Sequence, residues 1–246
     1  MKLSNNTVLI TGGASGIGFA LAEALIELNN TVIICGRDRE KLNAAGEQLP
    51  QLTTYVCDIT QSRDLTQMQA QLSVRFPKLN ILINNAGLQQ SLDFSGNRVD
   101  EPRIELEIET NLTAHIKLTN RLLPVLTSQE ESAIIFIGSA LARVPKHSAP
   151  IYCATKAALH SFAESLRYQL TNTTTRVIEV VPDVVETAMT ADRRDIKKMR
   201  PADLAKSVVQ GMKNNSRNIL IGRTRVLFGL HRLMPKIAQS IINKSI

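Results

Sequence analysis

The 246-residue chain contains no tryptophan, three tyrosines, three cysteines and no long apolar run. Because Cys35, Cys57 and Cys153 are odd in number and lack CxxC spacing, a disulfide framework and a zinc site are both disfavoured, and no bound metal is expected. No stretch reaches the roughly 18 consecutive apolar residues of a transmembrane helix. The N-terminus runs into a short apolar stretch and then glycines, unlike a signal peptide. These absences predict a cytoplasmic protein in a reducing compartment.

The composition is that of a globular protein with unevenly distributed charge. Hydrophobic residues make up 43% and charged residues 21% of the chain, which excludes wholesale disorder. Residues 191–246 hold 13 Lys/Arg against 3 Asp/Glu. This basic quarter is either a solvated face or the site of an anionic partner: a phosphorylated cofactor, an acidic substrate or a membrane surface. Nucleic acid is not expected, because aromatic residues make up only 4% of the chain and no nucleic-acid-binding motif occurs.

Short apolar runs rich in β-branched residues alternate with amphipathic stretches along the chain. The runs are nearly continuous in apolar character, which is typical of parallel strands covered on both faces. Their alternation with helical patterns predicts a single α/β domain with a doubly wound, mainly parallel, seven-stranded sheet and helices on both faces. The predicted strands are Thr7–Thr11, Thr31–Cys35, Thr53–Cys57, Asn80–Asn84, Ala133–Gly138, Arg176–Val181 and Asn218–Ile221. The predicted helices lie near residues 17–29, 38–48, 62–75, 101–127, 151–171 and 201–214.

Two segments depart from this alternation. Residues 183–200 are polar and basic and carry no strand pattern, and a long loop of this kind inside a compact domain is often a lid, here over the substrate. Residues 226–246 form a C-terminal amphipathic segment that Pro235 is expected to kink. Its apolar stripe consists of Leu230, Leu233, Met234, Ile237 and Ile241.

A glycine-rich turn, Thr-Gly-Gly-Ala-Ser-Gly-Ile-Gly, joins the first predicted strand to the first predicted helix. Gly12, Gly16 and Gly18 permit a tight turn, allow a pyrophosphate to approach the backbone, and let the helix pack close to the strand. The positive end of the helix then faces the phosphates. Because the turn opens a helix directly after the first strand of a βαβ unit, we expect it to bind a dinucleotide cofactor, with Ser15 and Ile17 also in contact.

Further motifs follow this turn in a consistent order. They are Asn84-Asn85-Ala86-Gly87, Asn111, Ser139, Tyr152-x-x-x-Lys156 and Pro182 to Thr187. With them the chain resembles the short-chain dehydrogenase/reductase family over almost its whole length, and the segments 33–37 and 152–161 resemble its DltE-like oxidoreductase subgroup. The resemblance implies one NAD(P)-binding Rossmann-fold domain over residues 1–246 that transfers hydride. It also implies a homodimer or homotetramer, with the helices that carry Asn111 and Tyr152 at one interface.

The end of the second predicted strand bears on the choice of cofactor. In the pattern of the family that the chain resembles, the carboxylate that binds the ribose 2′-hydroxyl of NAD falls at the position of Gly36. Glycine has no carboxylate to repel a phosphate, and Arg37 can pair with one. This favours NADP(H), with NAD(H) as the alternative if Arg37 is only a solvated charge. Asp38 is the expected N-cap of the next helix, and an inward turn of its side chain would weaken the NADP(H) interpretation. By resemblance, the further cofactor contacts are Asp58, Ile59, Asn85, Ala86, Gly87, Tyr152, Lys156, Pro182, Val185 and Thr187.

Tyr152 and Lys156 lie four residues apart on a predicted helix and therefore share one face. Hydride transfer to a carbonyl leaves negative charge on an oxygen that must receive a proton. We expect Lys156 to lower the pKa of Tyr152 from its usual value of about 10, so that the phenol acts as general acid/base. Ser139 is expected to hydrogen-bond the substrate oxygen. By resemblance, Asn111 maintains a water-linked proton relay to Lys156, which also holds the nicotinamide ribose.

The motif after the sixth strand departs from the family pattern, because Asp183 stands where the family has glycine. We expect Asp183 either to repel acidic substrates or to form a salt bridge with Arg193 or Arg194 of the lid.

The motifs together predict an NADP(H)-dependent enzyme that acts on a small-molecule carbonyl or secondary alcohol. The alternative is a catalytically silent dinucleotide-sensing or binding protein on the same fold. For residues 226–246, core or subunit packing is favoured over peripheral contact with a membrane, and closure of the substrate pocket is a third option.

Overall fold

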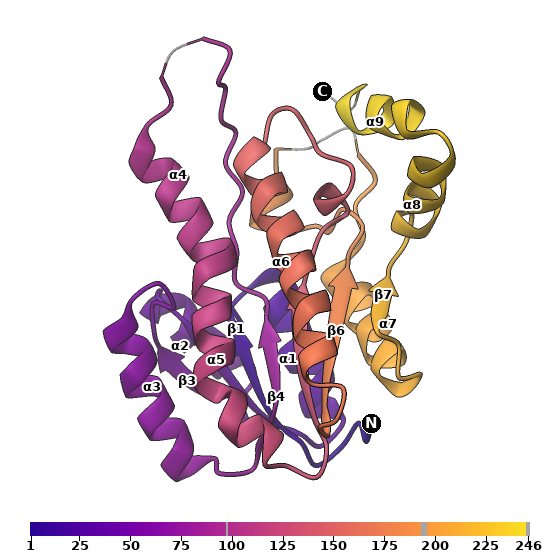
Figure 1. The fold of residues 1–246 in the computed structure, drawn as a ribbon. Coiled ribbons are helices and arrows are strands. Elements are labelled where there is room, and N and C mark those ends of the chain that lie inside the picture. Colours follow the sequence, from indigo (N-terminus) through magenta and orange to yellow (C-terminus); the bar gives the residue numbers. More distant parts are fainter. Residues whose placement is uncertain (97, 193–195, 245–246) are drawn as a thin grey trace.

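The protein is an α/β sandwich of three layers, seen in a computed structural model that describes residues 1–96, 98–192 and 196–244 (Figure 1). The central sheet has the strand order β3-β2-β1-β4-β5-β6-β7, and every neighbouring pair of strands is parallel. The strands are β1 (Thr7–Thr11), β2 (Thr31–Gly36), β3 (Thr53–Val56), β4 (Leu79–Asn84), β5 (Ser132–Ile137), β6 (Thr175–Val181) and β7 (Asn218–Leu220). Each begins and ends within one residue of its predicted position, and the Rossmann-type fold is confirmed.

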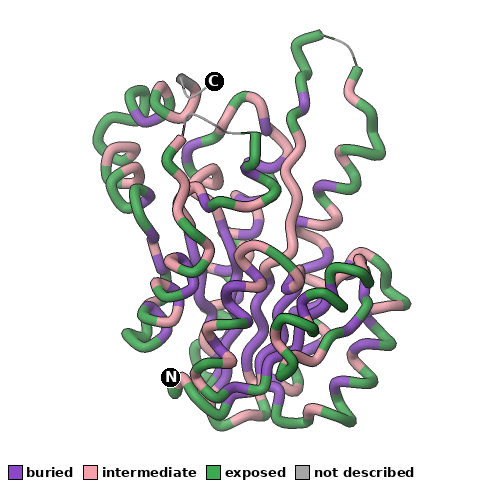
Figure 2. Tube along the Cα trace, turned by 180° about the vertical axis from the view of Figure 1, so that it is seen from behind, coloured by how far each residue is buried: buried purple, intermediate pink, exposed green. Residues whose placement is uncertain are grey.

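Helices cover both faces of the sheet and bury it almost completely (Figure 2). The described helices are α1 (Gly16–Glu27), α2 (Arg39–Gln48), α3 (Ser62–Arg75), α4 (Glu101–Ile108), α5 (Ala114–Thr127), α6 (Pro150–Gln169), α7 (Pro201–Lys213), α8 (Thr224–Leu233) and α9 (Pro235–Lys244). Helices α1, α2 and α7 pack on one face, and α3, α5 and α6 pack on the other. Because both faces are covered, all six residues of β5 are buried, which explains the continuous apolar runs in the sequence.

The order of the strands reverses at β1, with β2 and β3 on one side and β4 on the other. In an open parallel sheet this reversal leaves a crevice at the carboxyl ends of the strands, where ligands bind. The segments that follow β1, β4, β5 and β6 carry the motifs identified in the sequence, and the topology brings these segments to one edge of the sheet.

The segment predicted as one helix over residues 101–127 is interrupted. It consists of α4, a π-helical turn (Glu109–Thr113) and α5. The turn contains Asn111, whose side chain makes two hydrogen bonds to the backbone of Leu88 outside the helix. Such π-helical turns frequently occur at functional sites. The helical spacing of apolar residues in the sequence could not reveal the π-helical turn, because a single wider turn leaves the apolar spacing in α4 and in α5 unchanged.

The C-terminal segment forms two helices, α8 and α9, rather than one kinked helix (yellow in Figure 1). Pro235 takes the first position of α9, where its missing N–H leaves no helical hydrogen bond unmade. Several apolar side chains on this pair face solvent, with exposed fractions between 49% and 79%: Val226, Leu233, Met234, Ile237 and Ile241. Within the described ranges, no helix combines the length and the apolar character needed to cross a membrane.

Candidate active site

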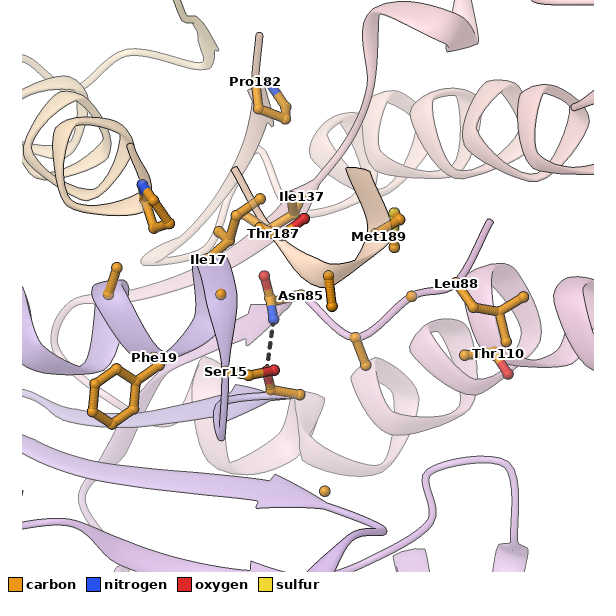
Figure 3. A pocket seen from close by; sticks show the side chains of 18 of the residues that line it. Ser15, Ile17, Phe19, Asn85, Leu88, Thr110, Ile137, Pro182, Thr187 and Met189 are labelled. Carbon is orange, nitrogen blue, oxygen red and sulfur yellow. Dashed lines mark hydrogen bonds between the residues drawn. The ribbon is translucent and has the colours of Figure 1, made fainter. Parts of the chain in front are cut away.

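A cleft of about 890 Å³ opens at the carboxyl edge of the sheet (Figure 3). Its walls come from the glycine-rich turn, the ends of β2, β4 and β5, the start of α6, the segment after β6 and the start of α7. Most of the predicted site residues line it: Gly12, Ser15, Gly16, Ile17, Arg37, Asp58, Ile59, Asn85, Ala86, Gly87, Tyr152, Lys156, Pro182 and Thr187. Residues brought together from across the chain therefore share one cavity, which is the arrangement the motifs predicted.

The glycine-rich turn is shaped by positions where a side chain does not fit. Gly12 and Gly16 have φ values of +62° and +56°, in the left-handed region that favours glycine. A Cβ at Gly18 would lie 2.5 Å from the carbonyl oxygen of Gly12, so glycine allows α1 to begin directly against the turn. The Asn85 side chain points toward this turn and donates a hydrogen bond to the Gly12 carbonyl oxygen at 3.2 Å (Figure 3). The result is a bare backbone surface at the N-terminus of α1, which fits a pyrophosphate.

The end of β2 presents positive charge to the cleft. Asp38 caps α2 by accepting a hydrogen bond from the Lys41 backbone N–H at 3.1 Å, as predicted, and it also pairs with the Lys41 ammonium at 3.1 Å. The hydrogen bonds from Lys41 hold the pKa of Asp38 below its usual value. Arg37 and Lys41 both line the cleft, and Arg37 is exposed with no ion-pair partner among the described residues. This corner of the cleft fits a phosphate on the adenosine ribose.

Tyr152 and Lys156 lie one helical turn apart near the start of α6, and both are buried in the cleft wall. The Lys156 ammonium donates a hydrogen bond to the Ile137 carbonyl oxygen at 2.8 Å and lies 5.6 Å from the centre of the Tyr152 ring. Burial lowers the pKa of Lys156 to about 8, although the Glu179 carboxylate acts in the opposite direction. The lysine is therefore a cation whose charge responds to pH near neutrality.

Asn111 and Ser139 adjoin the cleft without lining it. The Asn111 side chain accepts from the Leu88 N–H at 2.9 Å and donates to the Leu88 carbonyl oxygen at 2.8 Å. A Cβ at Gly87 would lie 3.2 Å from Asn111 Oδ1 and 3.9 Å from Lys156 Nζ, so this glycine brings the two side chains close to the cleft. Ser139 lines a smaller neighbouring cavity of about 50 Å³, and its Oγ accepts a hydrogen bond from the Leu141 N–H at 3.1 Å.

Two predicted cofactor contacts do not line the cleft. Gly18 lies behind the turn and acts through packing, as described above. Val185 is 4% exposed and belongs to the hydrophobic core, where its backbone pairs with Met199 in an isolated parallel bridge. Glu186, Thr187 and other residues of the 183–200 segment do line the cleft, so this segment borders the site.

Asp183 forms a salt bridge with Arg223, just before α8. The Arg223 Nε and a terminal guanidinium nitrogen each lie 2.9 Å from a carboxylate oxygen, and the Arg223 backbone N–H donates at 3.0 Å. Burial alone would raise the pKa of Asp183, but the hydrogen bonds from Arg223 and Val184 outweigh it and lower the pKa. The expected partners Arg193 and Arg194 lie outside the described residues. Asp183 thus ties the segment after β6 to the C-terminal helices.

Three ionisable residues near the site were missed as functional candidates. His115 is fully buried, and its Nε2 donates to the Ala86 carbonyl oxygen at 2.8 Å. Burial, reinforced by Lys156, lowers the pKa of His115 to about 3, so the ring is neutral and fixes the loop after β4. Glu179 and His160 are joined by a hydrogen bond between His160 Nδ1 and Glu179 Oε2 at 2.7 Å. A glutamate in the middle of the apolar run of β6 was the sequence signal for this pair.

Comparisons with known proteins agree with the fold. Residues 6–198 match the family model described as short chain dehydrogenase. The chain is 44% identical over 195 residues to the uncharacterized oxidoreductase DltE of Bacillus subtilis, covering 79% of this chain and 77% of that protein. An uncharacterized oxidoreductase of Staphylococcus aureus is 32% identical, over 85% of this chain and 92% of the relative. A short chain dehydrogenase from Burkholderia cenocepacia, solved in complex with NADP, superposes with a TM-score of 0.87 at 24% identity, covering 98% and 99% of the two chains.

Proposed function

Since the chain belongs to the short-chain dehydrogenase family of nicotinamide-dependent oxidoreductases, we propose that it transfers a hydride between NADP(H) and a carbonyl or secondary-alcohol substrate. The observation that carries the proposal is the position of Tyr152 and Lys156 together in the wall of a cleft that the bare glycine-rich turn also lines. A phenol and a cation at this position suit proton transfer beside a bound dinucleotide.

Each residue of the proposed catalytic group has a distinct task. When bound, the nicotinamide supplies or accepts the hydride. Tyr152 donates its Oη proton to the substrate oxygen in reduction and takes it back in oxidation. The Lys156 ammonium stabilises the tyrosinate. The Ser139 hydroxyl donates a hydrogen bond to the substrate oxygen as charge develops on it. Asn111 holds the Leu88 backbone and, with it, the shape of the cleft floor beside Lys156.

The charge at the end of β2 supports NADP(H) over NAD(H). Asp38 is engaged with Lys41 at the start of α2, so its carboxylate does not compete with a phosphate for Arg37. Arg37 is left exposed at the cleft, where its guanidinium can form two parallel hydrogen bonds to a phosphate. The NADP complex of the Burkholderia relative is consistent with this choice.

We also propose that the segment 183–200 acts as a substrate lid and that the chain forms a homodimer or homotetramer. Exposed apolar side chains on α4, Leu106 and Ile108, support an interface at the helices next to Asn111. Residues 226–246 then have subunit packing as their favoured role, ahead of peripheral membrane contact. Light scattering would separate a monomer from these assemblies.

The proposed function is tested by titrating the purified protein with NADPH and with NADH, at low and at higher salt, followed by a panel of carbonyl substrates. The expected result is tighter binding of NADPH that weakens with salt, and NADPH oxidation with at least one carbonyl. Tight binding without turnover of any carbonyl or alcohol would instead favour a dinucleotide-binding protein without chemistry. Binding of neither dinucleotide would contradict both.

A further inference from the structure

A second group of ionisable side chains lines the small cavity next to the cleft and does not line the cleft itself. It consists of Glu179 on β6, His160 on α6 and Arg143 just after the short helical turn Ala140–Ala142. The Glu179 side chain is 4% exposed and interrupts the apolar stretch over residues 177–181 of β6. A buried carboxylate is unfavourable unless hydrogen bonds or opposite charges compensate it.

The partners of Glu179 determine where the protons lie. The His160 Nδ1 is 2.7 Å from Glu179 Oε2, and the His160 Nε2 is 3.3 Å from a guanidinium nitrogen of Arg143. Arginine only donates, so Nε2 is the acceptor and the proton of a neutral imidazole resides on Nδ1. His160 therefore donates to the carboxylate and accepts from the guanidinium, so the imidazole links Glu179 to Arg143.

This group reaches the catalytic lysine through the end of β5. A Cβ at Gly138 would lie 2.6 Å from Glu179 Oε1, so the missing side chain lets the carboxylate approach this backbone. The preceding residue, Ile137, supplies the carbonyl that receives the Lys156 hydrogen bond. The cavity of about 50 Å³ that Ser139 lines is also lined by Glu179 and has room for a water molecule.

The charged and titratable groups that act on Lys156 come from three elements. Tyr152 lies one turn earlier on α6, and Lys156 interacts electrostatically with His115 of α5 and with Glu179 of β6. His115 is neutral, because its pKa is lowered to about 3. Glu179 is thus the negative charge that opposes the effect of burial on this lysine among the described residues.

We propose that the Glu179 carboxylate, held in place by His160 and Arg143, is the internal counter-charge that keeps the Lys156 ammonium protonated beside Tyr152 at neutral pH. Glu179 is a positioning residue, since it touches neither substrate nor cofactor and acts through the lysine. The proposal rests on the proposed function, in which Tyr152 exchanges the proton and Lys156 favours its ionised form.

The test follows the ionisation of Tyr152 in the protein without cofactor or substrate. Tyrosinate absorbs in the near ultraviolet, and the chain has three tyrosines and no tryptophan, so the background is small. The difference between the wild type and Tyr152→Phe isolates the contribution of Tyr152. In Glu179→Gln the lysine loses its proton at lower pH, so we expect Tyr152 to ionise about one pH unit higher than in the wild type. Glu179→Asp keeps the negative charge, so Tyr152 should ionise in this variant at a pH close to that of the wild type.

Two further variants make the experiment decisive. Glu164→Gln removes a half-exposed carboxylate from α6, the helix that carries Tyr152 and Lys156. Glu164 pairs with Arg167 at 3.6 Å, and its removal should leave the Tyr152 titration unchanged. His160→Ala removes the donor to Glu179 at a more exposed position. It should shift the titration in the same direction by a smaller amount, and it provides the test if Glu179→Gln does not fold.

An unchanged Tyr152 titration in folded Glu179→Gln, or an equal shift in Glu164→Gln, would overturn the proposal. The readout needs no turnover, so it separates this inference from the proposed function. A shifted titration in a protein that reduces no carbonyl would contradict the function and support the counter-charge. In an active enzyme, the pH of half-maximal alcohol oxidation should rise in Glu179→Gln together with the titration.

Discussion

The two walls of the cleft are built in different ways. The wall formed by the glycine-rich turn and the end of β2 relies on backbone geometry, with positive-φ glycines and an exposed Arg37. The wall that carries Tyr152 and Lys156 relies on buried ionisable side chains, and Glu179 lines a smaller cavity next to it. Lys156 and Glu179 are both below 5% exposed. The first wall can bind a phosphate by shape and charge, whereas the second can set the ionisation of a phenol. Substitutions in the first should therefore change affinity, and substitutions in the second should change the chemical step.

The largest expected effect comes from the buried wall. Lys156→Met removes the cation beside Tyr152, and we expect kcat/KM to fall by about 10³-fold, within the range of general acid–base catalysis. Steady-state kinetics with NADPH and an accepted carbonyl would measure the loss. Lys213→Met, which removes an exposed ammonium at the end of α7, is the matched control and should retain wild-type rates. Similar rates in both variants would mean that the buried cation has no chemical role.

A second effect concerns stability and follows from the low pKa of Lys156. The pKa is about 8 in the folded protein, against an ordinary value of 10.5. Between these values the unfolded chain binds a proton that the folded protein has released, so the free energy of unfolding should rise with pH, by roughly 3 kcal/mol at most. Denaturant unfolding of the wild type and Lys156→Met from pH 7 to 10 would measure the difference. Parallel profiles would contradict the burial argument.

The backbone wall should show a smaller effect that is confined to affinity. Arg37→Ala should weaken NADPH binding about tenfold and leave NADH binding nearly unchanged, because only NADPH carries the phosphate. The loss should shrink at high salt. Arg39→Ala, two residues further on and exposed outside the cleft lining, serves as the control in the same fluorescence titration. An equal loss of NADH affinity would show that Arg37 does not bind the phosphate on the adenosine ribose.

The smallest effect is expected where the site joins the C-terminal helices. Asp183→Asn weakens the salt bridge to Arg223, which is largely exposed, so we expect a loss of about 1 kcal/mol or less in the free energy of unfolding. Arg225→Ala removes a nearby exposed charge and should lower the free energy of unfolding by less than Asp183→Asn does. Denaturant unfolding of both variants at neutral pH measures the two losses. A larger effect on NADPH affinity than on stability would give Asp183 a role in the cleft instead.

The same division explains what could be predicted from the sequence. The strand boundaries and the glycine-rich turn were predictable, because continuous apolar runs and glycine spacing are local patterns with a direct geometric meaning. The π-helical turn at Asn111 and the Asp183–Arg223 pair depend on contacts between segments far apart in the chain. Val185 is expected by resemblance to present its backbone to the cofactor, and its side chain lies in the core. The neutral state of His115 and the pairing of Glu179 follow from burial, which only the packed fold reveals.

The proposed role of Tyr152 as the acid–base group is tested most directly by measuring turnover and NADPH affinity together in Tyr152→Phe. This change removes only the phenolic oxygen from a residue that is 8% exposed in the cleft wall. We expect turnover to fall by about 10³-fold or more while NADPH affinity stays within about twofold of the wild type. Undiminished turnover in this variant would contradict the assignment of Tyr152 as the group that exchanges the proton with the substrate.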